Sequence, residues 1–78
     1  MSYEVRLKTI DQVKYMIRYH LENNTIEGSE VIDNIAELVV DKYPGIWDRW
    51  NVLDLLLVTN EFKLFVNNEN EHLVKLRS

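Results

Sequence analysis

The hydrophobic period of this chain changes near residue 61, and that change limits the folds open to it. From residue 10 to this point, apolar residues recur with the three-to-four-residue spacing of amphipathic helices. After it, they alternate with polar residues over 62–66 and 72–76, the period of two that is typical of strands. The residues between the two runs, 67–71, are rich in Asn, which favours turns. The sequence therefore predicts an α+β fold in which helices precede a C-terminal β-hairpin.

The length of the hairpin loop decides which side chains lie opposite one another. A five-residue loop pairs Leu64 with Val74 and Phe62 with Leu76, and it keeps both apolar sets on one face. A four-residue loop shifts the register by one residue and sends the two sets to opposite faces, which is costly. We therefore expect the five-residue loop.

Two helices are predicted before the Tyr-Pro-Gly sequence at 43–45. This sequence is expected to end the second of them, because the residue before a proline is pushed out of helical geometry. The first spans about residues 9–23, with Thr9 as its N-cap and Gln12 closing a capping box. Ser29 is expected to cap the second. The polar side of this second helix, interpreted as a solvated face, carries four acidic residues: Glu30, Asp33, Glu37 and Asp41.

A third helix and two short segments complete the prediction. The helix spans about 46–58, residues 25–27 form a short extended bridge, and residues 1–8 form either an extra strand or a loosely packed tail. The order helix, short strand, helix, helix, strand, strand is that of a winged helix, and 78 residues suffice for one such domain over 1–78. A three-helix bundle that carries a separate hairpin has the same elements and stays the alternative.

Charge is distributed unevenly along the chain. Residues 25–61 hold two basic and eight acidic residues, a net charge of −6, whereas the whole chain carries −4 and each flank +1. DNA-binding proteins draw much of their affinity from Lys and Arg at phosphates. We therefore expect the middle of the chain to bind a protein rather than nucleic acid.

The predicted third helix has more apolar residues than one core-facing stripe requires. At about 100° per residue, the sector predicted to face the core contains Ile46, Trp50, Leu53 and Leu57. The remaining apolar residues either are covered by the other elements or form a surface for a partner. The predicted protein-binding residues are Trp47, Val52 and Leu55 for apolar contact, and Asp48 and Asp54 for electrostatic selection.

Two alternatives stay open. One is a DNA-binding transcriptional regulator, which as a dimer would pair two basic hairpins. Its predicted nucleic-acid-binding residues are Arg49, Asn51, Lys63 and Lys75. The other is a homodimer or larger homo-oligomer that covers the spare apolar surface with a second copy.

The sequence contains no catalytic or metal-binding motif. It has no Cys and no Gly-rich phosphate loop, and its three Ser lie at the termini or at a predicted cap. Of its two His, His20 is expected as a packed core residue and His72 as the cross-strand neighbour of Val66. We therefore expect no enzyme, no cofactor and no metal ion.

We expect the protein to be cytoplasmic. Its longest apolar run, 55–58, is far shorter than the roughly 18 residues that a membrane span needs. The N-terminal sequence MSYEVRLKT lacks the apolar core of a secretory signal, and the absence of Cys fits a reducing compartment.

Two stretches, EVIDNIAELV at 30–39 and LLLVTNEFKLFVNNENEHLVKL at 55–76, resemble the winged-helix domain at the amino terminus of the RNA polymerase delta subunit of Gram-positive bacteria. The resemblance extends over about residues 9–77 as a pattern of apolar positions. It implies an acidic winged helix that docks on a protein and has no catalytic residues. We expect a small protein-binding module of transcription regulation or of a phage or other mobile element.

Overall fold

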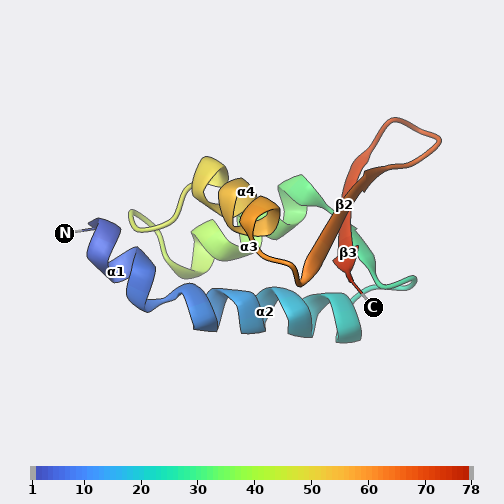
Figure 1. Cartoon of the computed structure of the whole chain (residues 1–78). Coiled ribbons are helices and arrows are strands. Elements are labelled where there is room, and N and C mark those ends of the chain that lie inside the picture. Colours follow the sequence, from blue (N-terminus) through green and yellow to red (C-terminus); the bar gives the residue numbers. More distant parts are fainter. Residues whose placement is uncertain (1, 78) are drawn as a thin grey trace.

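Residues 2–77, the part of the chain that the computed structural model describes, form four helices and a three-stranded antiparallel sheet (Figure 1). This confirms the predicted α+β class. α1 lies at one end of the molecule and the hairpin at the other, and α2 runs along one side (Figure 1). In chain order the elements are α1 (Ser2–Lys8), α2 (Ile10–Asn23), β1 (Ser29–Val31), α3 (Ile32–Lys42), α4 (Arg49–Val58), β2 (Phe62–Val66) and β3 (His72–Leu76).

The N-terminal segment is a helix, so the predicted extra strand is wrong. Tyr3, Val5 and Leu7 alternate with polar residues, but on α1 all three side chains are exposed. A short alternating run becomes a strand only where a sheet edge receives it, and α1 packs against the start of α2 instead. The tail is therefore helical, and its apolar side chains are left in solvent.

Thr9 is the N-cap of α2, as predicted, but the capping box with Gln12 is wrong. The Thr9 hydroxyl makes no capping bond. It donates to the Arg6 carbonyl (2.9 Å) and accepts a hydrogen bond from the indole Nε1 of Trp47 (2.8 Å). The hydroxyl that the local sequence pattern assigned to capping the helix therefore binds a distant residue, Trp47, instead.

The short strand lies four residues later than the predicted bridge, and the predicted Ser29 cap is wrong. Ser29 is the first residue of β1 and pairs with Lys75, while Val31 precedes α3 in extended conformation. The earlier residues form a turn instead. The Thr25 hydroxyl accepts from the Gly28 amide at 3.0 Å, and Gly28 has a positive φ of 79° that reverses the chain into β1.

The hairpin has the predicted five-residue loop. Phe62 pairs with Leu76 and Leu64 with Val74, so the predicted register is confirmed. Inside the loop, the Asn67 side-chain oxygen accepts from two backbone amides, those of Glu69 and Glu71, which fixes the turn. The sheet order is β1-β3-β2, so β3 is central and β2 forms one edge.

α4 begins three residues later than predicted. α3 ends at the predicted break, and its C-cap is Tyr43. The chain then turns through Gly45, at a φ of 78°, and reaches Asp48, which forms a reciprocal capping box with Asn51. Because this box needs Asp48 in extended conformation, the helix starts at Arg49.

Candidate interaction surface

Three residues predicted to contact a partner lie in the core. Trp47 is 4% exposed, Val52 is fully buried and Leu55 is 6% exposed. All three belong to the cluster of buried side chains that joins the helices to the sheet. The predicted apolar partner surface is therefore wrong, because these side chains are covered by the protein itself.

The opposite face of α4 is the exposed one. Trp50 and Leu57, predicted to face the core, are 67% and 63% exposed, while Ile46 and Leu53 are partly buried. The sequence RWNVLDLLLV is apolar on almost every side, so helical period alone cannot select a face. Packing against α3 and β2 makes the selection instead.

Trp50 is accompanied by an ion pair that links α4 to α3. Arg49 donates from Nη2 and Nε to one oxygen of Asp33, at 2.7 and 2.8 Å. The same guanidinium carbon lies 5.6 Å from the centre of the Trp50 ring, within cation–π distance. The first turn of α4 therefore presents an exposed aromatic side chain next to a positioned arginine.

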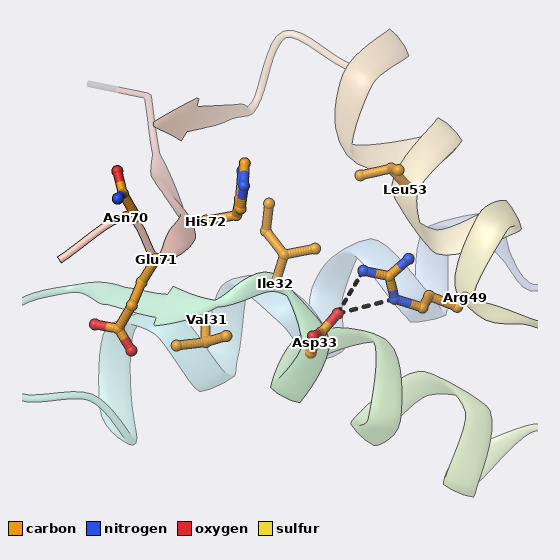
Figure 2. A pocket seen from close by; sticks show the side chains of 8 residues that line it. All are labelled: Val31, Ile32, Asp33, Arg49, Leu53, Asn70, Glu71 and His72. Carbon is orange, nitrogen blue, oxygen red and sulfur yellow. Dashed lines mark hydrogen bonds and ion pairs between the residues drawn. The ribbon is translucent and has the colours of Figure 1, made fainter. Parts of the chain in front are cut away.

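Two hollows meet at this ion pair, since Asp33 and Arg49 line both. The first, about 430 Å³, lies between α3, α4 and the end of the hairpin loop (Figure 2). The second, about 410 Å³, continues along α3. We call the two hollows together the acidic groove. Its other residues are Val31, Ile32, Leu53, Asn70, Glu71 and His72 in the first hollow, and Ala36, Glu37, Val40 and Asp41 in the second.

The acidic groove combines apolar side chains with a negative charge. It holds four carboxylates and one guanidinium, a net charge of −3 with His72 neutral. Among residues 2–77, no basic group lies within ion-pair distance of Glu37, Asp41 or Glu71. The Glu71 carboxylate accepts a hydrogen bond from Asn67 Nδ2 at 2.9 Å, whereas Glu37 and Asp41 are free to pair with groups from outside. The groove therefore suits a segment that is both basic and partly apolar.

Most of these acidic residues were assigned from the sequence to a solvated face. Asp33, Glu37 and Asp41 recur every four residues, which aligns them on one side of α3. That spacing was the available signal. The spacing along α3 does not predict the contribution of Glu71, which the fold brings to the same groove from the hairpin loop.

The two acidic residues that were predicted to select a protein partner, Asp48 and Asp54, lie outside the groove. Asp48 is committed to capping α4. Asp54 is exposed and lines a separate hollow of about 200 Å³ with Arg6 and Val58, between α1 and α4. The fold therefore places neither of these predicted carboxylates in the groove.

The predicted nucleic-acid-binding residues fall into two groups. Arg49 and Asn51 are engaged within the protein, in the ion pair and the capping box. Lys63 and Lys75 are exposed and lie directly opposite each other on the hairpin. Lys75 Nζ also lies 5.3 Å from the centre of the Phe65 ring. Only the two lysines are left free for phosphate.

His20 is not enclosed in the core but forms a half-buried pair with Glu30. Its Nε2 lies 2.8 Å from Glu30 Oε1, and the carboxylate also accepts from the Asn34 side chain and the Val31 amide. Burial raises the pKa of Glu30, but these hydrogen bonds outweigh it and leave the pKa below its usual 4.5. The other histidine, His72, pairs with Val66 as predicted.

No group of three or more potential metal ligands occurs among residues 2–77. None of their helices is long and apolar enough to cross a membrane. In comparisons with protein-family models, with curated proteins and with solved structures, nothing matches this chain.

Proposed function

We propose that this chain is a small non-enzymatic winged-helix module that binds a basic segment of a partner protein in the acidic groove. The winged-helix assignment is supported by the short strand before α3 and by the sheet order β1-β3-β2 after α4. The resemblance to the RNA polymerase delta subunit supports a place in transcription regulation, in the host or in a phage or other mobile element.

The observation that carries the proposal is the union of two hollows around one ion pair. Together they form an apolar floor bordered by the free carboxylates of Glu37 and Asp41. The exposed Trp50 lies against Arg49, which lines both hollows. Tryptophan is enriched among the residues that contribute most binding energy at protein interfaces. We expect Trp50 to contact the apolar side of the bound segment, and the lysines or arginines of that segment to pair with Glu37 and Asp41.

Nucleic acid is disfavoured by the same surface. Phosphates would meet the net charge of −3 in the groove, and Arg49 already pairs with Asp33. A positively charged protein segment is favoured by the groove, because its basic groups can pair with the free carboxylates there.

Site-specific photo-crosslinking tests the proposal. A photo-reactive phenylalanine derivative replaces Trp50 in one variant and Tyr15 in the other, since these aromatic side chains are 67% and 62% exposed but lie on different helices. Both are irradiated in lysate of the native host, with and without nuclease treatment, and the crosslinked peptides are sequenced by mass spectrometry. We expect position 50 to capture one protein through a Lys- or Arg-rich segment, and position 15 to capture none of it.

A matched pair of charge reversals identifies the groove. Glu37→Lys with Asp41→Lys removes two free carboxylates and is expected to abolish crosslinking from position 50. Asp11→Lys with Glu22→Lys makes the same change in net charge on exposed positions of α2 and should leave it unchanged. Capture through an acidic or uncharged segment, or capture that is lost only with nuclease, would contradict the proposal.

A further inference from the structure

The outer edge of the sheet has unpaired backbone groups. Among the residues that the structure describes, 2–77, β2 pairs only with β3. Hydrogen bonds from the Asn67 amide to the Glu71 carbonyl and from the Arg77 amide to the Glu61 carbonyl show which residues of β2 direct their backbone groups toward β3. Bonded pairs recur every second residue in an antiparallel ladder. The amides and carbonyls of Phe62, Leu64 and Val66 therefore point away from β3, toward the free edge.

This edge carries little protection against pairing with another strand. Its sequence, FKLFV, has no proline and one charge, and its register with β3 runs without a bulge. The Phe62 carbonyl accepts a hydrogen bond from Arg77 Nη2 at 3.4 Å. Within residues 2–77, the outward groups of Leu64 and Val66 have no partner.

We propose that β2 pairs antiparallel with β2 of a second copy, about a two-fold axis at Leu64, to give a continuous six-stranded sheet. The pairing is isologous, so each copy contributes the same five residues to it. Leu64 then exchanges both of its outward hydrogen bonds with Leu64 of the second copy, and Val66 pairs with Phe62.

A second copy fits this edge because the strand is complementary to itself in that register. Phe62, Leu64 and Val66 point to the same side as the core, so their pairing continues one apolar surface and covers Val66, which is now 53% exposed. On the outer side, Lys63 comes to lie opposite Phe65 of the second copy. The protein already makes such a contact between Lys75 and Phe65.

Neighbouring registers are less favourable. An axis at Lys63 would place two lysines directly opposite each other, which is destabilising. An axis at Phe65 would place Lys63 opposite Asn67, within the loop, where the strand has already ended. The edge also shares no residue with the acidic groove, so this inference stands independently of the proposed function.

Sedimentation equilibrium of the full chain tests the dimer, and charge substitutions at residue 65 test its register. We expect the mass to rise with concentration toward twice the monomer's 9.3 kDa. Phe65→Lys sets two like-charge pairs against Lys63 across the axis and should weaken the dimer by about tenfold or more. Phe65→Glu sets two opposite-charge pairs there and should tighten it. The control, Leu73→Lys, places the same charge on the same outer face but on the central strand and should leave the dimer unchanged.

Amide hydrogen exchange gives a second readout that does not depend on a substitution. Exchange at Leu64 and Val66 should slow as the protein concentration rises, whereas Lys63 and Phe65, already bonded to β3, should be protected at every concentration. A chain that stays monomeric at the highest concentration attainable overturns the proposal. So does a dimer in which Phe65→Lys has no effect while circular dichroism shows an intact fold. A dimer that Phe65→Glu weakens places the axis elsewhere and overturns the register.

Discussion

Leu56 and Leu57 are neighbours on α4 with opposite surroundings, and they allow the buried face of this helix to be tested with one type of substitution. Leu56 is 1% exposed and belongs to the core, whereas Leu57 is 63% exposed. The sector of this helix that the sequence analysis predicts to face the core contains Leu57. Leu56→Ala and Leu57→Ala are therefore a matched pair for which sequence pattern and structure predict opposite results.

The expected difference is large compared with the stability of so small a domain. Replacing a buried Leu by Ala costs about 2–5 kcal/mol, from lost burial and from the cavity left behind. A chain of 78 residues has a free energy of unfolding of only about 4–12 kcal/mol, at about 0.05–0.15 kcal/mol per residue. We expect Leu56→Ala to lose about 3 kcal/mol, and Leu57→Ala to change the stability by less than about 0.5 kcal/mol.

Urea denaturation followed by circular dichroism measures both variants. With an m value of about 1 kcal/mol per molar urea, the loss at Leu56 lowers the unfolding midpoint by about 3 M, and the midpoint for Leu57→Ala stays within about 0.5 M of the wild type. Equal losses in the two variants, or a larger loss at Leu57, would refute the orientation of α4 described above.

Substitutions at three further positions test local features of the fold by the same denaturation measurement. Thr9→Val removes the acceptor of the buried Trp47 indole and should cost about 1–3 kcal/mol, while Thr9→Ser should restore most of it. Glu30→Gln removes a carboxylate whose pKa is lowered by His20 and other donors. The stabilisation that comes from this lowered pKa is complete above the usual pKa of 4.5 and is lost as pH falls through the folded value, so the stability gap between wild type and variant should narrow as pH falls below 4.5. Gly45→Ala should cost about 1 kcal/mol from the positive φ alone, because nothing lies near the added methyl group.

The hairpin could be predicted because two simple constraints act on it together. Alternation fixes which residues of each strand share a face, and the loop length fixes how the two faces meet. Leu64 can then pair only with Val74 if both apolar sets are to lie on one side. No information from elsewhere in the chain is needed for that step.

Predictions failed where a distant residue decided the outcome. The Thr9 hydroxyl binds Trp47, 38 positions away, in place of capping its own helix. The residues of α4 are apolar on nearly every side, so its buried face follows from where α3 and the sheet lie. The segment from Tyr3 to Leu7 alternates in sequence, but it packs against α2 and not against an edge of the sheet, and it is helical.

The acidic groove could be predicted only in part for the same reason. The four-residue spacing along α3 is visible in the sequence, but it reads as a solvated face until another surface lies beside it. Arg49 and Trp50 come from α4, and Glu71 from the hairpin loop. A site assembled from three segments cannot be identified from any one of them alone.

The two tryptophans offer the most direct test of the central claim, that the acidic groove binds a basic protein segment. Trp50 is exposed beside the groove, whereas Trp47 is buried and its indole binds Thr9, so their indole N–H signals are separate reporters in one NMR spectrum. In a titration of the ¹⁵N-labelled chain with the basic segment captured by crosslinking, we expect the Trp50 indole and the amides of Glu37 and Asp41 to shift, while the Trp47 indole stays in place. Shifts confined to Lys63 and Lys75, or no shift at Trp50 at saturation, would contradict the claim.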